Sequence, residues 1–283
     1  MKHGEFPVVF ACGGEQLLGI VHPGDAARIG VVIVVGGPQY RVGSHRQFVL
    51  MARDLAREGY PVFRFDYRGM GDSNGAARGF EHAADDIRAA IDAFAAAVPG
   101  LSGFVLWGLC DAASACLMYC ASDARVRGVI IANPWVRTEA GEARSYLRHY
   151  YLQRLTQPSF WRKVLKGEFR AGQSLTQLSQ TVRQSSAQGA GGPGFIERMR
   201  AGLQSFRGPV LCLMSERDLT AREFELLREQ DRSWRRLMSR PAVTTLALPG
   251  ADHTFSSRAA LELVREKSVA WLAQLTPARK AAS

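Results

Sequence analysis

The sequence has no long apolar run and no segment typical of a secretory signal. No stretch approaches the ~18 consecutive apolar residues of a membrane-spanning helix, so no membrane span is expected. The opening residues, MKHGEFPVVFACGGEQLLGI, also lack an apolar stretch followed by a small-residue cleavage site. A cytoplasmic location is therefore expected as the default.

Cysteine is scarce, and its spacing argues against two common uses. The five cysteines are an odd number at irregular intervals, which disfavours a disulfide framework. The sequence has no CxxC pair, HExxH motif or GxGxxG motif, so it indicates neither a metal nor an organic cofactor. Cys116, Cys120 and Cys212 stand among apolar residues and are expected to be buried. Cys110 is the exception because of its position.

The composition is that of a globular domain with a local excess of positive charge. Hydrophobic residues make up 47% and charged residues 22% of the 283 residues, which suits the packed core of one large domain. Much of the net charge of +10 lies between residues 137 and 207, where twelve Lys or Arg stand against four Glu. This segment indicates one positive face, either a solvated helical surface or a site for an anionic ligand. Nucleic-acid binding has no other support and is not expected.

Strand and helix patterns alternate along most of the chain. The pattern predicts an opening hairpin over residues 8–23, followed by buried apolar strands that are mostly separated by helices. Strands are expected at 28–37, 61–69, 103–108, 126–134, 208–218 and 242–250, and helices at 45–60, 80–98, 110–122, 221–239 and 257–275. This alternation predicts an α/β fold with a mainly parallel central sheet flanked by helices.

The alternation stops between Trp135 and about Phe206, where aromatics and arginines accompany helical patterns. Residues 1–134 and 207–283 are therefore expected to form two parts of one core. Residues 135–206 are expected to be a helical insertion that serves as a lid or cap over the core.

A cysteine stands at a strand-to-helix turn in VLWGLCDAASA, residues 105–115. Gly108 and Ala112 lie two positions before and after Cys110. This spacing fits a strand–nucleophile–helix elbow, in which a strained backbone leaves room only for small residues. The N-terminus of the following helix would favour a thiolate. Cys110 is thus either a nucleophile or a small buried residue at a helix start.

Further motifs stand where an α/β-hydrolase needs them. VIVVGGPQY ends a strand in glycines, RFDYRGMGDS contains the loop of the next strand, and MSERD and GADHTF supply an acid and a histidine after the cysteine. The chain order nucleophile, acid, histidine is that of the α/β-hydrolases. The sequence resembles this superfamily over essentially the whole chain outside the insertion, and the resemblance implies the α/β-hydrolase fold.

The segments GGPQYRVGSHRQF and RFDYRGMGDS, together with a cysteine in the elbow, resemble the exosortase A system-associated hydrolases. The resemblance implies a bacterial protein encoded beside machinery for exopolysaccharide and for sorting proteins with a C-terminal signal. It implies no particular substrate. The cysteine is also similar to that of the dienelactone hydrolases, which share the fold and a Cys-His-Asp arrangement.

The predicted catalytic triad consists of Cys110, His253 and Asp218. Cys110 would attack an acyl carbon and form a thioester intermediate. His253 would accept the thiol proton, or pair with the thiolate, and later activate water. Asp218 would hold the histidine tautomer, with Glu216 as the second choice for the acid. Asp252 adjoins His253 in the chain and is expected to shape its loop instead.

The oxyanion hole is predicted to use two backbone N–H groups. One belongs to Asp111, the residue after the nucleophile. The other must come from the GGPQY loop, in which Pro38 has no N–H. Gln39 is preferred as this second donor, and Gly37 is the alternative.

The candidate substrate-binding residues near these motifs are Tyr40, Arg41, His45 and Trp135. Arg41 is a candidate to bind a carboxylate or phosphate, and His45 would either line the mouth of the pocket or cap a helix. Arg68 is expected to hold its own loop through Asp66 or through backbone carbonyl groups.

The predicted function is the hydrolysis of an ester, thioester or lactone in a small-molecule acyl substrate, through an acyl-enzyme on Cys110. The positive segment leaves an anionic substrate open. An acyltransferase that passes the acyl group to a saccharide or another acceptor is the alternative within enzymes, because the elbow serves both reactions. A non-catalytic binding protein on a hydrolase fold is the alternative from another class. The sequence predicts no oligomeric state.

Overall fold

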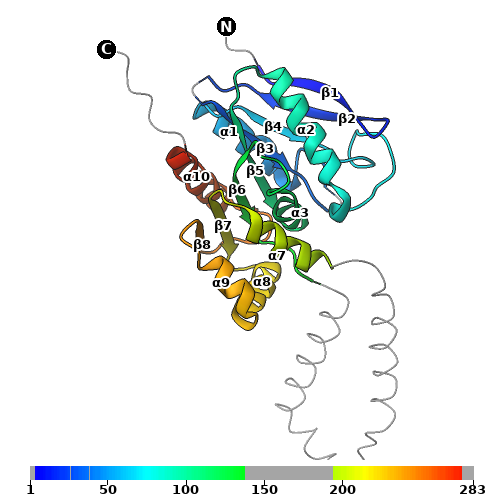
Figure 1. Cartoon of the computed structure of the whole chain (residues 1–283). Coiled ribbons are helices and arrows are strands. Elements are labelled where there is room, and N and C mark those ends of the chain that lie inside the picture. Colours follow the sequence, from blue (N-terminus) through cyan, green and yellow to red (C-terminus); the bar gives the residue numbers. More distant parts are fainter. Residues whose placement is uncertain (1–3, 26, 38, 138–193, 276–283) are drawn as a thin grey trace, which may run out of the picture. The chain divides into compact units, whose positions relative to one another are not determined.

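The computed structural model describes residues 4–25, 27–37, 39–137 and 194–275 (Figure 1). Contacts within the chain define two compact units, of which the first comprises Met1–Val136 and Phe195–Ser283, and the second Arg137–Gly194. All the helices and strands described below belong to the first unit. The predicted cap falls mainly on residues 138–193, outside the described residues, so the cap stays a prediction.

An eight-stranded sheet forms the centre of the first unit (Figure 1). The strands lie in the order β1-β2-β4-β3-β5-β6-β7-β8. β1 and β2 pair antiparallel, as do β2 and β4, and the other neighbouring strands pair parallel. Their bounds are β1 Phe6–Cys12, β2 Glu15–His22, β3 Ile29–Val34, β4 Val62–Phe65, β5 Gly103–Leu109, β6 Val126–Ala132, β7 Val210–Ser215 and β8 Val243–Leu248. The opening hairpin and the mainly parallel sheet confirm the predicted α/β fold class.

The inner strands are buried on both faces, as their composition explains. β3 reads IGVVIV and β5 reads GFVLWGL, and β5 is buried along its whole length. A parallel sheet covered by helices on both sides has no solvent-facing strand face, so continuous apolar runs are stable there. The carboxyl ends of parallel strands share one edge of the sheet, which is where α/β proteins bind their ligands. The predicted site residues follow β3, β5, β6, β7 and β8 at this edge.

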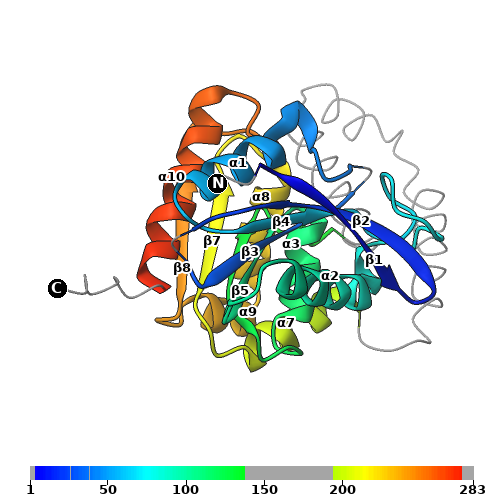
Figure 2. The ribbon, with the colours of Figure 1, turned by 90° about the horizontal axis from the view of Figure 1, so that it is seen from above.

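Helices cover both faces of the sheet (Figure 2). α1 and α10 pack on one face around a core that includes Val31, Trp107 and Leu213. α2, α3, α7, α8 and α9 pack on the other face around Phe63, Phe94 and Met199. The helix bounds are α1 Gln47–Arg57, α2 Ala84–Ala97, α3 Asp111–Tyr119, α7 Phe195–Ser205, α8 Leu219–Gln230, α9 Arg232–Met238 and α10 Arg258–Leu275, with short 3-10 turns at Ser44–Arg46 and Phe80–His82.

The prediction of one helix over residues 221–239 is wrong, because the chain breaks there into α8 and α9. Asp231 takes an extended conformation, with φ of −97° and ψ of 120°. Its carboxylate accepts hydrogen bonds from the N–H groups of Ser233 at 2.7 Å and Trp234 at 3.0 Å. An aspartate that caps a new helix in this way competes with continuation of the preceding helix.

α7 packs against α3 and belongs to the same compact unit as the sheet, although its residues were assigned to the insertion from the sequence. A Cβ on Gly202 would lie 2.0 Å from the carbonyl oxygen of Leu117, so glycine permits this close contact between the helices. Met199 and Leu203 of α7 are fully buried. The apolar face of α7 thus completes the core of the first unit.

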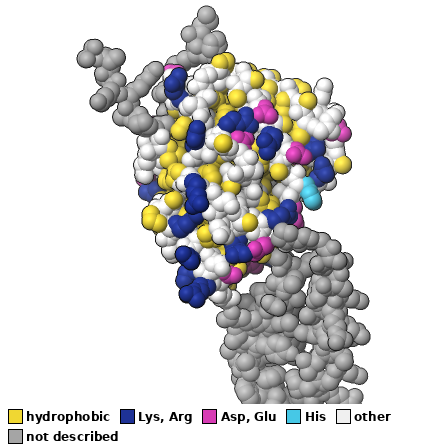
Figure 3. Space-filling view, viewed as in Figure 1, with side chains coloured by type: hydrophobic (Ala, Val, Ile, Leu, Met, Phe, Trp, Pro, Cys, Tyr) yellow, Lys and Arg dark blue, Asp and Glu magenta, His cyan; other side chains and the backbone are white. Residues whose placement is uncertain are grey.

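Basic side chains on the face shown in Figure 3 lie singly or in small groups, with acidic side chains among them. Many of the charges are paired, as in the ion pairs Arg198–Glu81 and Arg125–Asp123.

Within the described part of the chain, no helix has the length and apolar character needed to cross a membrane.

Candidate active site

Cys110 joins the end of β5 to the start of α3 through a strained backbone conformation. Its φ of 61° and ψ of −125° lie outside the regions that residues with a side chain ordinarily adopt. A Cβ on Gly108 would lie 2.6 Å from the carbonyl oxygen of Ala112, so only glycine fits at that position. The Cys110 N–H donates to the carbonyl of Ala132 at 2.9 Å, and the Cys110 carbonyl accepts from the Trp135 N–H at 3.1 Å. The chain therefore makes the tight turn that the sequence predicts, and backbone hydrogen bonds hold it.

Cys110 differs from the other four cysteines in its exposure. It is partly exposed, whereas Cys12, Cys116, Cys120 and Cys212 are buried. Burial raises the pKa of each of these four thiols, to about 12 for Cys120 and Cys212. A buried thiol that stays protonated is a poor nucleophile. Of the five cysteines, Cys110 is the one that is partly exposed and stands at the elbow.

His253 contacts both Cys110 and Asp218. Its Nδ1 atom lies 2.9 Å from Oδ2 of Asp218, and the ring also makes a hydrogen bond with the Cys110 side chain. Because Nδ1 faces the carboxylate, Nε2 is the nitrogen left for the thiol. The hydrogen bonds with Asp218 and then Cys110 raise the pKa of His253 to about 10, although burial opposes them. The site therefore favours an imidazolium at neutral pH.

The turn between β7 and α8 fixes the position of Asp218. Asp218 is the N-cap of α8, and its carboxylate accepts hydrogen bonds from the N–H groups of Thr220 at 3.1 Å and Ala221 at 3.3 Å. Its side chain is 5% exposed. A capping carboxylate has little freedom to turn away, so the helix N-terminus keeps Asp218 directed at His253.

The two neighbouring acids point elsewhere. Glu216 accepts a hydrogen bond from the Gly250 N–H at 2.7 Å. Asp252 accepts one from the Ser256 N–H at 2.8 Å and thereby shapes the loop that carries His253. Asp218 is thus the acid that contacts the histidine, and Glu216 is engaged at a different place.

Asn133 is a site residue that the sequence did not single out. It follows β6, is fully buried, and has a φ of 46°. Its Nδ2 donates to Ser215 Oγ at 3.0 Å and to the His253 carbonyl at 3.4 Å, and its Oδ1 accepts from the Ser215 N–H at 2.8 Å. Asn133 therefore ties β6 to β7 and to the histidine loop. The signal was its position, a polar residue at the carboxyl end of a strand predicted to be parallel.

The loop after β3 lies against the elbow. The Gly37 N–H donates to Oδ2 of Asp111 at 2.7 Å. A Cβ on Gly36 would lie 2.0 Å from Oδ1 of Asp111, so glycine is needed for this approach. The Gln39 side chain accepts a long hydrogen bond from the Ser44 N–H at 3.4 Å. Of the two predicted loop donors, Gly37 is the one whose N–H reaches the residue after Cys110.

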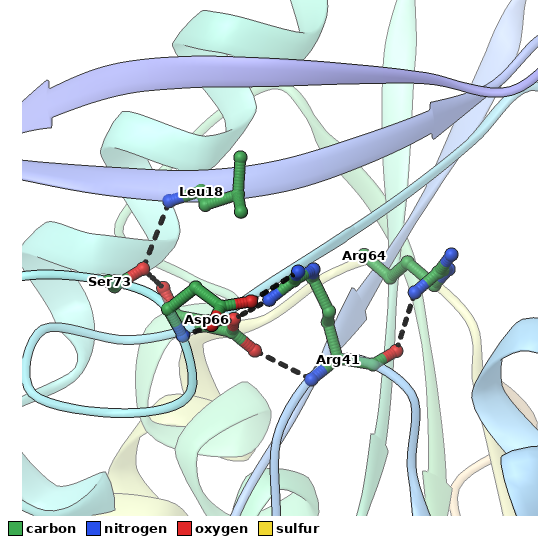
Figure 4. A network of polar contacts seen from close by, with 6 residues as sticks. Leu18, Arg41, Arg64, Asp66 and Ser73 are labelled. Carbon is green, nitrogen blue, oxygen red and sulfur yellow. Dashed lines mark hydrogen bonds and ion pairs between the residues drawn. The ribbon is translucent and has the colours of Figure 1, made fainter.

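Arg41 binds carboxylates of its own chain (Figure 4). Its guanidinium pairs with Asp66 and, at 2.6 Å, with Asp72, while its backbone N–H donates to Asp66 at 2.6 Å. The Arg64 guanidinium donates to the Arg41 carbonyl at 3.0 Å, and the Ser73 hydroxyl donates to the Asp66 carbonyl at 2.9 Å. This network joins the GGPQYR loop to the RFDYRGMGDS loop. The Arg41 side chain is 12% exposed, and its charge is balanced by carboxylates of the same chain.

The partner predicted for Arg68 is wrong. Arg68 pairs with Asp86 through Nε and Nη2, each at 2.9 Å, and its backbone N–H donates to the same carboxylate at 3.0 Å. The first turn of α2 supplies Asp86, whereas Arg41 already occupies Asp66. Arg68 does hold its loop, but through a helix that lies later in the chain.

The other candidate residues lie around the elbow and the loop after β3. Tyr40 is 45% exposed, and the Arg41 guanidinium lies 5.7 Å from the centroid of its ring. His45 is in the 3-10 turn before α1 and has a φ of 52°. Trp135 is partly buried, and its carbonyl accepts a hydrogen bond from the Ser114 hydroxyl of α3 at 2.6 Å. Nothing in these contacts shows a substrate, so their binding role stays a prediction.

The arrangement of thiol, imidazole and carboxylate can transfer a proton and form a thioester. Across the described ranges, no group of three or more His, Cys, Asp or Glu side chains is arranged to hold a metal ion.

The chain belongs to the alpha/beta hydrolase family, whose family model matches residues 31–266. Among solved structures, an esterase of Pyrococcus furiosus, Pf2001, is similar with a TM-score of 0.65 at 14% identity, over 95% of this chain and 90% of that one. Est1E of Butyrivibrio proteoclasticus, solved with ferulic acid bound, is similar with a TM-score of 0.62 at 13% identity, over 95% and 98%. The alpha/beta hydrolase GrgF of Penicillium sp. sh18 is similar with a TM-score of 0.65 at 17% identity, over 96% and 99%. Identities this low show a shared fold. No curated protein matches the sequence.

Proposed function

We propose that the chain is a cysteine-dependent acyl hydrolase that acts on an ester, thioester or lactone of a small molecule. The observation that carries the proposal is the line of contacts from Cys110 through His253 to Asp218, built on a strained elbow at the carboxyl end of β5. Strained backbone at a nucleophile persists only when the surrounding structure holds it. The hydrogen bonds on both sides of Cys110 supply that support.

In the proposed reaction, Sγ of Cys110 attacks the acyl carbon while His253 holds the proton that came from the thiol. A carbon–sulfur bond forms, and the electron pair of the carbonyl moves to its oxygen. The pair then returns, the bond to the leaving oxygen or sulfur breaks, and His253 gives its proton to the leaving group. Water next attacks the thioester, His253 accepts the proton of that water, and release of the acid restores Cys110.

The backbone N–H groups of Gly37 and Asp111 are the proposed oxyanion donors. They come from the loop after β3 and from the residue after the nucleophile, which the structure brings together through the Asp111 side chain. Two aligned N–H donors stabilise the developing negative charge, and each contributes roughly 10²-fold or more in rate. Esters and thioesters are favoured over amides because the amine of an amide leaves only after strong protonation, whereas a thiolate attacks activated acyl groups readily.

The finer assignment belongs to the same proposal. The segments GGPQYRVGSHRQF and RFDYRGMGDS, with the cysteine elbow, support a place among the exosortase A system-associated hydrolases. A bacterial and cytoplasmic location is a further part of it, and so is a cap formed by residues 137–194, the part of the predicted insertion that lies outside the first unit. The Arg41 ion pairs speak against Arg41 as the group that binds an anionic substrate.

The test is a kinetic comparison of acyl substrates on the full chain. We expect p-nitrophenyl acetate, phenyl thioacetate and a simple lactone to be turned over, and acetanilide to be inert. Cys110→Ala abolishes turnover, whereas Cys120→Ala, which removes a buried thiol, retains it. Turnover that survives Cys110→Ala overturns the proposal. A rate that rises on addition of saccharide, with acylated sugar as product, identifies an acyltransferase instead.

A further inference from the structure

The carboxylate of Asp111 occupies a hydrogen-bond donor that an oxyanion would need, the Gly37 N–H. Its Oδ2 accepts from the Gly37 N–H at 2.7 Å, and its Oδ1 accepts from the Ala112 N–H at 2.9 Å. The Gly37 N–H, one of the two that we assign to the oxyanion hole, is therefore engaged by this side chain in the resting protein.

The carboxylate and a substrate oxygen cannot both use the Gly37 N–H. The loop after β3 packs closely on the carboxylate, because a Cβ on Gly36 would lie 2.0 Å from Oδ1 of Asp111 and 2.7 Å from the Ala112 nitrogen. An N–H group makes one strong hydrogen bond at a time. An acyl oxygen that enters the hole must therefore displace the Asp111 side chain.

A cavity beside Asp111 offers the displaced carboxylate a place. Its volume is about 160 Å³, and Asp111, Gly37 and Tyr67 are among the residues that line it. Met70, Phe80 and Ala83 supply apolar wall. Arg68 and Asp86 also line it, but they are paired with one another, so their charges are balanced. Arg78 lines the cavity as well and is exposed to solvent.

Among the described residues, the Tyr67 hydroxyl of this cavity has no hydrogen-bond acceptor. Tyr67 is 7% exposed, and its hydroxyl oxygen has no hydrogen-bond partner among the described residues. Burial raises the pKa of Tyr67 well above its ordinary value, and the negative charge of Asp111 raises it further, so the hydroxyl keeps its proton. A buried hydroxyl without a hydrogen-bond partner is costly, and native proteins rarely leave one. Asp111 lines the same cavity, and its carboxylate is an acceptor for this hydroxyl once it leaves the Gly37 N–H.

We propose that Asp111 is a positioning residue with two arrangements, on the Gly37 N–H at rest and on the Tyr67 hydroxyl when an acyl oxygen occupies the hole. The inference rests on the proposed function, since it assigns the Gly37 and Asp111 N–H groups to an oxyanion. In the resting arrangement the carboxylate holds the loop after β3 against the elbow through the Gly37 N–H. In the second arrangement the Tyr67 hydroxyl donates a hydrogen bond to the buried Asp111 carboxylate. This bond lowers the free-energy cost of moving the carboxylate out of the oxyanion hole.

Acylation and alkylation of Cys110 separate this role from a merely structural one. Acylation by p-nitrophenyl acetate passes through an oxyanion, whereas alkylation by iodoacetamide displaces iodide and forms none. We expect Tyr67→Phe to slow acylation about tenfold, the loss of one hydrogen bond to a charged group, and to leave alkylation unchanged. Tyr119→Phe is the matched control, because it removes another buried hydroxyl, one that donates to Asp123 at 2.9 Å. It should leave both rates unchanged.

A double-variant cycle tests the coupling between the two side chains. With Asp111→Ala in place, no carboxylate needs a partner, so adding Tyr67→Phe should change acylation less than about twofold. The same tenfold loss in both backgrounds overturns the inference, and so does an equal loss in alkylation. If Cys110 is alkylated but never acylated in the unaltered chain, the proposed function fails as well. If Cys110 is acylated but the effects of the Asp111 and Tyr67 substitutions are independent, only the present inference fails.

A structure of the chain treated with propanal gives a second test, which needs no variant. The Cys110 thiol adds across the carbonyl to form a thiohemiacetal, whose oxygen takes the thiol proton and sits where the oxyanion forms. We expect the Asp111 carboxylate within hydrogen-bonding distance of the Tyr67 hydroxyl in this adduct. A carboxylate that remains on the Gly37 N–H overturns the inference.

Discussion

The Nδ1 atom of His253 lies 2.9 Å from Oδ2 of Asp218, although 35 residues separate them in the chain. Asp218 caps α8 after β7, and His253 lies in the loop after β8, so the parallel pairing of β7 and β8 brings the two loops together. Cys110 approaches the imidazole from the end of β5. The three residues of the proposed triad therefore lie at one edge of the sheet.

Asp218→Asn tests the role of the acid. An amide cannot stabilise the imidazolium and can favour the wrong tautomer, so we expect acylation of Cys110 to slow by about 10³–10⁴-fold. Burst kinetics with p-nitrophenyl acetate measure this rate. Glu216→Gln is the control, because Glu216 binds the Gly250 N–H and does not contact His253. An equal loss in the two variants would remove Asp218 from its assigned place.

The raised pKa of His253 predicts a pH-dependent contribution to stability. The pKa rises from 6.5 to about 10 on folding, so between these pH values the folded chain binds more protons than the unfolded chain. The contribution is complete below about pH 6.5 and disappears as the pH rises through about 10. We expect the difference in free energy of unfolding between the unaltered chain and His253→Gln to shrink over this window. Urea unfolding at a series of pH values measures it, and a constant difference contradicts the account.

His22 predicts the opposite trend at lower pH. It is 2% exposed, its Nε2 accepts from Arg64 Nε at 2.8 Å, and its Nδ1 therefore carries a proton toward Glu5 at 3.2 Å. Burial and then the Arg64 charge lower the pKa of His22 to about 4. The unfolded chain thus binds more protons between pH 4 and 6.5, and this contribution to stability is lost as the pH falls through that range.

We expect His22→Gln to flatten part of the decline in stability between pH 6.5 and 4. His82→Gln, at an exposed histidine, is the control and should keep the decline of the unaltered chain. Equal slopes for the two variants would show that His22 does not carry the effect.

Asn133 predicts a loss of activity that exceeds its loss of stability. Asn133→Ala removes the hydrogen bonds to Ser215 and His253 and also places alanine at a φ of 46°. Asn133→Gly removes the same bonds but tolerates that φ. We expect both variants to slow acylation by roughly tenfold, as for the loss of one or two buried hydrogen bonds, with the glycine variant the more stable. Rates that follow stability rather than the lost bonds would reduce Asn133 to a structural residue.

The sequence was sufficient for features that depend on local pattern. The β-branched run of β3 and the small residues around Cys110 each carry their structural meaning within a few positions, so the sheet and the elbow could be predicted. The order of Cys110, Asp218 and His253 indicated the site because parallel strands deliver their carboxyl ends to one edge. That reasoning predicted which side chains lie near one another, but it did not predict their individual contacts.

The contacts that the sequence did not reveal are long-range choices between similar partners. Arg41 and Arg68 each had several acids within reach of their loops, and tertiary packing gave Asp66 to Arg41 and Asp86 to Arg68. The break at Asp231 depends on a capping bond that outweighs a helical pattern on either side. The Asp111 carboxylate could not be foreseen on the Gly37 N–H, because its direction depends on how the loop after β3 packs.

The most direct test of the central claim is the site of acylation measured by mass spectrometry. The chain is mixed with p-nitrophenyl acetate, quenched in acid and digested, and each cysteine peptide is examined for a gained acetyl group. We expect a single acetyl group on Cys110 that disappears with time, and no acetylated Cys110 in His253→Ala over the same interval. Acetylation of Cys12 or Cys212 in place of Cys110, or equal labelling of Cys110 with and without His253, would contradict the account.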